Sequence, residues 1–148
     1  MTIMSSQNHS GRIALFIPSL QGGGAERVMV NLANEFASRG LLVDLLVLTG
    51  DGPYRNLLTP AINIINLNRS RLMTGLIPLG LFLRREKPAV VISAMKHANI
   101  IVLLASKICF TGVPIIVSEH NNTTLSLGRS SRPLNWIMKQ LMRLTYPW

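Results

Sequence analysis

The stretch ALFIPSLQGGGAERVMVNLA, residues 14–33, predicts a short apolar strand, a turn with three consecutive glycines and then a helix. Residues 12–18 are hydrophobic without alternation, which is typical of a strand buried on both faces. Residues 25–38 have helical spacing, and Gly40 is well placed to end that helix. Its expected buried stripe consists of Val28, Leu32 and Phe36. The order strand, glycine turn, helix predicts the start of an α/β domain.

Apolar runs and helical patterns keep alternating along the rest of the chain. Further strands are predicted at residues 41–49, 62–67, 89–95 and 113–119, with 62–67 nearer an edge of the sheet. Helices are predicted at 70–86, capped by Ser70 and kinked or split at Pro78, at 97–110, and from Pro133 to about 145 after a polar loop at 121–132. Continuous Val, Ile and Leu runs separated by helices predict a parallel sheet with helices on both faces. We expect a disordered tail at 1–11 and one domain over 12–148.

The composition favours an anionic partner. The 148 residues carry a net charge of +9, which suits nucleic acid, anionic lipid or phosphorylated ligands.

Cys109 is the single cysteine, so an internal disulfide is excluded and a reducing compartment is expected. One cysteine and separated histidines match no zinc-ligand spacing, and we expect no metal site. The most apolar segment, residues 99–117, contains Lys107 and is broken at Gly112 and Pro114. It is interpreted as a buried helix and a strand, not a membrane span.

Three glycines in the first strand–helix turn, Gly22, Gly23 and Gly24, predict a phosphate-binding site. Glycine lets an anion reach backbone N–H groups, and a helix start attracts negative charge. The dinucleotide fingerprint and the phosphate-loop pattern are both absent, which disfavours NAD binding and P-loop NTPase activity. A turn that only permits tight helix–strand packing remains the alternative. Glu26 complements the helix dipole, and if functional it would bind a hydroxyl, since it would repel a phosphate.

Two histidines follow predicted strands at the same edge of the sheet. His97 lies in SAMKHAN after the fourth strand, and its alternative role is to cap the helix start together with Lys96. His120 lies in SEHNN after the fifth strand, between Glu119 and Asn121. Histidine can move a proton near neutral pH or hold a sugar hydroxyl, so both are candidate catalytic residues. A serine hydrolase is disfavoured because no Gly-x-Ser-x-Gly sequence is present.

The last predicted helix, in PLNWIMKQLMRLTYPW, is amphipathic and cationic. Arg132, Lys139 and Arg143 lie on its polar side with Trp136. Such helices can lie on anionic membrane surfaces. The alternative is a helix that covers the domain and has an ordinary solvated face. Nucleic acid is not expected, since no recognition motif is present and the aromatic residues are few.

Taken together, FIPSLQGGGAERVMVNLANEFASRG, KPAVVISAMKHAN and PIIVSEHNN resemble the amino-terminal half of retaining family-4 glycosyltransferases of the GT-B fold. The likeness covers residues 12–148 and is closest to enzymes that build bacterial lipid-linked oligosaccharides, O-antigens and capsules. It implies a Rossmann-like acceptor-side domain, a second domain that binds a nucleotide-sugar, and catalysis between them. It also implies a peripheral position on the inner face of the cytoplasmic membrane.

Carried over residue by residue, the resemblance implies that Gly22, Gly23 and Gly24 approach the donor diphosphate. His97 or His120 would lie by the transferred sugar or the acceptor hydroxyl. The expected acceptor-binding residues are Lys96, Glu119, Asn121, Arg132, Lys139 and Arg143. No metal or other cofactor is implied, because helix N-termini and basic groups can stabilise a leaving diphosphate.

The sequence also differs from the family in one respect. The family's sixth strand and donor-binding domain have no counterpart in residues 12–148, so we expect the 148-residue chain to lack transferase activity alone. The function predicted is the acceptor-side part of a hexosyltransferase that uses a nucleotide-sugar and a lipid-linked glycan acceptor. The alternatives are a non-catalytic, membrane-associated binding module of the same fold and, less favoured, a dehydrogenase-type nucleotide-binding protein.

Overall fold

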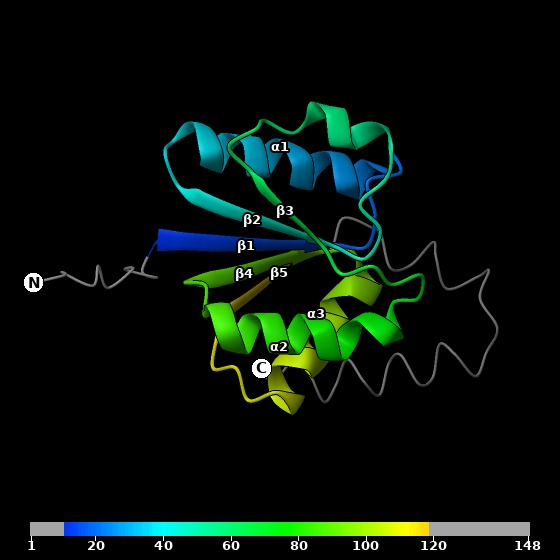
Figure 1. Cartoon of the computed structure of the whole chain (residues 1–148), viewed down its shortest axis with the longest axis vertical. Coiled ribbons are helices and arrows are strands. Elements are labelled where there is room, and N and C mark those ends of the chain that lie inside the picture. Colours follow the sequence, from blue (N-terminus) through cyan, green and yellow to red (C-terminus); the bar gives the residue numbers. More distant parts are fainter. Residues whose placement is uncertain (1–10, 119–148) are drawn as a thin grey trace, which may run out of the picture.

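The computed structural model describes residues 11–118, and within them one parallel sheet forms the centre of the domain (Figure 1). Its strands lie in the order β3-β2-β1-β4-β5. Their bounds are β1 Arg12–Ile17, β2 Leu42–Val47, β3 Asn63–Asn66, β4 Val90–Ala94 and β5 Ile115–Ser118. The prediction that residues 62–67 form a strand near an edge is confirmed, because β3 pairs with β2 alone among the described strands.

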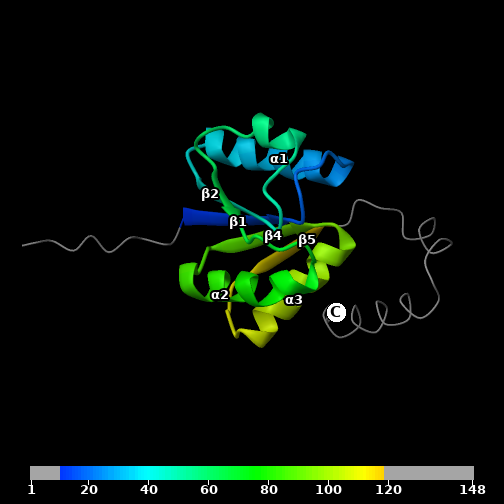
Figure 2. The ribbon, with the colours of Figure 1, turned by 45° about the vertical axis from the view of Figure 1, so that its right-hand side comes forward.

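Helices cover both faces of this sheet, as Figures 1 and 2 show. Helix α1 (Gly24–Ser38) packs on one face together with the short 3₁₀ helix η2 (Pro53–Leu57). Helices α2 (Leu76–Glu86) and α3 (Lys96–Ile108) pack side by side on the other face, and a second 3₁₀ turn, η3 (Met73–Gly75), precedes α2. The three layers confirm the predicted α/β, Rossmann-like class.

Strand β1 shows why the sequence lacks alternation there. Ala14 and Phe16 pack toward α2 and α3, whereas Leu15 and Ile17 pack toward α1. All four side chains are fully buried. Successive residues of a strand point to opposite faces, so a strand covered on both sides needs hydrophobic residues at every position.

The predicted stripe of α1 is confirmed for Leu32 and Phe36, which pack against the core, and is wrong for Val28. Val28 is exposed by 44%, whereas Met29, Val30 and Ala33 are buried. Leu32 and Phe36 lie at the border of the buried side. Both sets of residues have helical spacing, so periodicity alone could not choose between them.

The predicted end of α1 at Gly40 is confirmed. Gly40 has a φ of +80°. Its N–H donates to the carbonyl of Ala37 at 3.0 Å, and Leu41 N–H donates to that of Phe36 at 3.1 Å. This pair of bonds is the Schellman arrangement, in which a residue of positive φ reverses the chain and satisfies the last carbonyls of the helix.

The predicted helix at residues 70–86 needs two corrections. Ser70 lies outside the helix, and the N-cap of α2 is Gly75, with no side-chain hydrogen bond. The segment is divided as expected, but the division lies between η3 and α2 and not at Pro78. Pro78 is the third residue of α2, where a missing N–H costs nothing because the first turn has no intrahelical acceptor for it.

Some predictions fall on parts of the chain that the structure does not describe. These are residues 1–10 of the tail predicted at 1–11, the polar loop at 121–132 and the helix from Pro133. Among the described residues, none of the helices has the length and hydrophobicity that crossing a bilayer requires.

Candidate functional site

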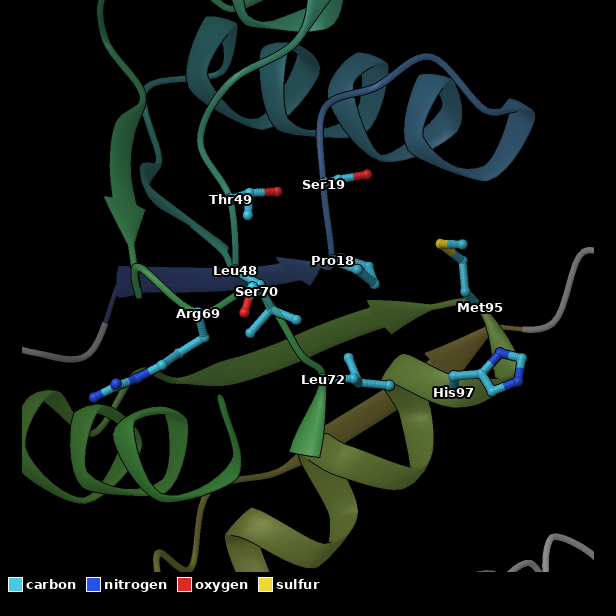
Figure 3. A pocket seen from close by; sticks show the side chains of 9 residues that line it. All are labelled: Pro18, Ser19, Leu48, Thr49, Arg69, Ser70, Leu72, Met95 and His97. Carbon is cyan, nitrogen blue, oxygen red and sulfur yellow. The ribbon is translucent and has the colours of Figure 1, made fainter. Parts of the chain in front are cut away.

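A pocket of about 340 Å³ lies at one edge of the sheet and is lined by the residues that follow four neighbouring strands (Figure 3). The connection after β1 leads to β2 on one side, whereas β4 pairs with β1 on the other side. The pocket therefore lies where the strand order reverses, which is the usual ligand position in open α/β sheets.

Each of the four strands contributes part of the pocket lining. Pro18 and Ser19 follow β1, and Leu48 and Thr49 follow β2. The other lining residues are Arg69, Ser70 and Leu72 after β3, and Met95 and His97 after β4. The lining thus combines three hydroxyl-bearing residues, an arginine and a histidine with apolar side chains. This combination suits a ligand that has both hydroxyl or phosphate groups and apolar surface.

Arg69 reaches the pocket through the β3–α2 loop, which we define as residues 67–72. The N–H of Leu67 donates to the carbonyl of Val47 at 2.8 Å, and the N–H of Arg69 donates to that of Leu48 at 2.9 Å. Between them Asn68 adopts a φ of +52°. The loop therefore continues the pairing of β3 with β2, and this fixes the backbone of Arg69.

The guanidinium of Arg69 is exposed and points away from His97 in Figure 3. Exposed side chains change rotamer within nanoseconds, so its charge can turn toward a ligand at little cost. Arg69 is not among the site residues predicted from the sequence. The available signal was an arginine directly after a strand, in a stretch without acidic residues.

His97 lies in the first turn of α3. Its side chain is exposed and lines the pocket. The turn before it contains Met95, which has a φ of +84° and forms the N-cap of α3. No side chain makes a capping hydrogen bond there, so the alternative role of His97 and Lys96 as caps finds no support. Non-glycine residues held at positive φ are strained, and such strain is concentrated at binding sites.

The glycine turn, Gly22 to Gly24, lies at the same edge but outside the pocket lining. Gly23 is the N-cap of α1, and the carboxylate of Glu26 lies so close to it that a Cβ atom at Gly23 would collide. Glu26 is buried and accepts a hydrogen bond from the Ser19 hydroxyl at 3.2 Å. Ser19 therefore joins the pocket to the glycine turn, and a phosphate at Gly23 would meet a negative charge.

The other two glycines have different surroundings. Gly22 has a φ of +113°, and its carbonyl accepts a hydrogen bond from the Tyr54 hydroxyl at 3.2 Å. A Cβ atom at this position would lie at ordinary contact distance from Pro53 and Tyr54. Gly24 has open space where a side chain would project. All three are exposed. Their predicted contact with a donor phosphate stays a prediction, with Gly24 offering the most room.

The remaining predicted site residues fall into two groups. Lys96 is the first residue of α3 and does not line the pocket. Glu119, His120, Asn121, Arg132, Lys139 and Arg143 lie outside the described residues. The last described strand ends at Ser118, opposite Ala94, and the buried Asn99 side chain donates to its carbonyl at 3.1 Å. Over residues 11–118, no three His, Cys, Asp or Glu side chains gather into a metal site.

Comparison with known families decides what kind of domain carries this pocket. The model of Glycosyltransferase Family 4 matches residues 22–147, which is most of the chain and begins in the glycine turn. The chain belongs to this family. No curated protein matches it. This family-4 domain is thus a glycosyltransferase domain, and its family connects it in general terms with a sugar donor and an acceptor. The parallel sheet and its helices agree with an amino-terminal GT-B domain.

Proposed function

We propose that this domain forms the acceptor side of a retaining hexosyltransferase in bacterial polysaccharide biosynthesis. The enzyme would transfer a sugar from a nucleotide-sugar to a lipid-linked glycan, at the inner face of the cytoplasmic membrane. The observation that carries the proposal is the pocket at the point where the strand order reverses, lined by hydroxyl groups, Arg69 and His97 around apolar side chains.

The chemistry of the lining suits a sugar attached to a diphosphate. Ser19 and Thr49 can bond sugar hydroxyls, and Leu48 and Leu72 offer apolar surface to the face of a sugar ring or to the first lipid carbons. Arg69 can form charge-assisted hydrogen bonds with the diphosphate. His97 can accept a proton from the acceptor hydroxyl, a role that it would share or exchange with His120.

The glycine turn supports a donor position on the other side of Ser19. Gly24 begins α1, where free N–H groups attract a phosphate. Glu26 lies beside Gly23 and would accept a hydrogen bond from a hydroxyl of the transferred sugar. Helix starts and basic side chains would stabilise the leaving diphosphate, and the proposal requires no metal. Lys96, Glu119, Asn121, Arg132, Lys139 and Arg143 remain proposed acceptor contacts.

Binding of a defined acceptor tests the proposal directly. The probe is undecaprenyl diphosphate carrying one N-acetylhexosamine, in detergent micelles, titrated into the 148-residue chain. Replacing Arg69→Gln should weaken binding about tenfold or more, since a hydrogen bond between charged groups contributes about 1.5–3 kcal/mol. Arg71→Gln is the matched control, because Arg71 is exposed in the same acid-free stretch but does not line the pocket. It should bind within about twofold of the unmodified chain.

Three outcomes would count against the proposal. Equal losses for Arg69→Gln and Arg71→Gln would show that only net charge matters. No difference between the probe and undecaprenol would show that the pocket does not recognise the sugar diphosphate. Binding to lipid vesicles without binding of the probe would favour the alternative, a membrane-associated module without catalysis.

A further inference from the structure

The hydroxyl of Ser19 offers the pocket hydrogen-bond acceptors only. Ser19 lines the pocket, and its Oγ donates a hydrogen bond to Oε1 of Glu26 at 3.2 Å. A serine hydroxyl has one proton and two lone pairs, so the proton given to Glu26 is not available to a ligand. On its pocket side Ser19 therefore accepts hydrogen bonds, and a ligand group that bonds it must carry a proton.

Glu26 places a negative charge directly behind Ser19. Its side chain is buried, and within residues 11–118 no basic side chain forms an ion pair with it. The adjacent Arg27 lies over the ring of Tyr54 instead, 5.5 Å from the ring centroid. The start of α1 is equivalent to only about half a positive charge, so it offsets part of the carboxylate charge. A second anion beside Ser19 would therefore be repelled.

The surrounding backbone holds this pair of side chains in place. Oε2 of Glu26 occupies the space in which a Cβ atom at Gly23 would lie, so the glycine makes room for the carboxylate. The carbonyl of Pro18, the residue before Ser19, accepts a hydrogen bond from the N–H of Leu48 at 3.1 Å. The position of the Ser19 hydroxyl is thus fixed before a ligand arrives.

The far side of the pocket carries the opposite charge. Arg69 follows β3 and Ser19 follows β1, and both of these strands pair with β2. Neighbouring strands lie about 4.8 Å apart, so the two residues leave the sheet roughly 10 Å from each other. Figure 3 shows them on separate segments of the chain. The pocket is therefore polarised, with a buried carboxylate behind Ser19 and an arginine across from it.

We propose that Ser19, backed by Glu26, determines which end of a ligand occupies its side of the pocket. This side takes a neutral group that donates a hydrogen bond, either a hydroxyl or an amide N–H, and it rejects phosphate and carboxylate. Phosphate groups bind on the side of Arg69. Glu26 is a positioning residue, because it acts through Ser19. The neutral group is identified as the acceptor sugar only through the proposed function, and that sugar would then be a neutral one and not a uronic acid.

Alkylation of introduced thiols measures this polarity without any ligand. Ser19→Cys and Ser70→Cys are made in the 148-residue chain, since Ser70 also lines the pocket but follows β3. Each variant is treated with iodoacetate, which is an anion, and with iodoacetamide, its neutral analogue. Both reagents react with the thiolate, so the ratio of their rate constants does not depend on how much thiolate is present. The same variant unfolded in urea is the reference, and the unmodified chain gives the background from the buried Cys109.

The ratio of the iodoacetate rate to the iodoacetamide rate should fall about threefold or more on folding of Ser19→Cys, because Glu26 repels the anion. It should not fall on folding of Ser70→Cys. Adding Glu26→Gln to Ser19→Cys should return the ratio to within about twofold of its value in urea. Glu35→Gln is the matched control, because Glu35 also lies on α1 but is paired with Arg39. Added to Ser19→Cys, it should change the ratio less than about twofold.

Titration of two lipid-linked sugars in detergent tests the identity of the neutral group. The probes are undecaprenyl diphosphate carrying N-acetylglucosamine and the same carrier with N-acetylglucosaminuronic acid, in which a carboxylate replaces the hydroxymethyl group. The unmodified chain should bind the neutral probe about tenfold more tightly. Glu26→Gln should reduce this preference to less than about threefold, whereas a purely structural role of Glu26 would weaken both probes equally.

The two parts of the proposal can fail separately. A ratio for Ser19→Cys that does not fall on folding would overturn the polarity, and this comparison needs no change at Glu26, so it holds even where Glu26→Gln does not fold. A fall that Glu26→Gln leaves unchanged would overturn the role of Glu26. Equal binding of the two probes would overturn the placement of the sugar at Ser19. If neither probe binds while the alkylation ratios are as expected, the proposed function fails and the polarity of the pocket stands.

Discussion

The glycine turn and the β3–α2 loop both follow strands at the same edge of the sheet, yet the sequence marks them very differently. Three consecutive glycines make the turn conspicuous, whereas the loop reads LNRSRL and contains no obvious motif. In the structure the loop supplies Arg69, Ser70 and Leu72 to the pocket, and the glycine turn supplies nothing to its lining. The glycine motif therefore predicts at which edge of the sheet the pocket lies, but it does not predict the residues that line the pocket.

The two segments also differ in what holds them. Two hydrogen bonds connect the turn region with residues 51–54. The N–H of Tyr54 donates to the carbonyl of Leu20 at 3.2 Å, and the side-chain amide of Gln21 donates to the carbonyl of Asp51 at 3.1 Å. The β3–α2 loop is held by backbone bonds to the end of β2. The turn thus depends on close approach between loops, and the β3–α2 loop depends on continued strand pairing. Three stability measurements can test this difference.

The largest effect is expected at Gly52, where the chain passes against the glycine turn. Gly52 has a φ of +149°, and a Cβ atom there would collide with the backbone carbonyl of Leu20. Gly52→Ala should lower the free energy of unfolding by about 2–3 kcal/mol, measured by urea denaturation. Gly40→Ala is the control, since Gly40 also has a positive φ but open space around it, and should cost about 1 kcal/mol. Equal losses would show that the close approach contributes nothing.

An intermediate effect is expected within the turn itself. Gly23→Ala would displace the Glu26 carboxylate from its place beside Ser19 and put a poor N-cap on α1, at a cost of about 1–2 kcal/mol in the free energy of unfolding. Gly24→Ala has open space and should change it by less than about 0.5 kcal/mol. The same urea titrations apply. A Gly24→Ala variant as unstable as Gly23→Ala would contradict the assigned role of Glu26.

The smallest effect is expected in the β3–α2 loop. Asn68 adopts a left-handed conformation that asparagine tolerates better than alanine. Asn68→Ala should therefore cost about 1 kcal/mol, whereas Asn68→Gly should be within about 0.5 kcal/mol of the unmodified chain. Thermal unfolding followed by circular dichroism can compare the two. If both variants lose the same stability, the backbone conformation of Asn68 is not what holds the loop.

Asp44 illustrates what sequence patterns left unexplained in the fold. In the sequence it is a single charge that interrupts the hydrophobic run at 41–49. In the structure it is buried, 3.2 Å from the Arg12 guanidinium, and accepts a hydrogen bond from the Asn63 amide at 2.8 Å. Its partners come from β1 and β3, the two neighbours of β2. Since a buried carboxylate needs such partners, its presence in the strand depends on the strand order, which no local pattern specifies.

The sequence by itself determined the α/β class, the strand and helix segments, the end of α1 at Gly40 and the position of His97 at the carboxyl edge. These features depend on periodicity, glycine conformations and the direction of a parallel strand, all of which are local properties. Only the tertiary structure decided that Arg69 and His97 line the same pocket, that Glu26 lies against Gly23, and that α2 exposes its apolar side. Those outcomes depend on which distant segments pack together, and many weak contacts across the whole domain set that choice.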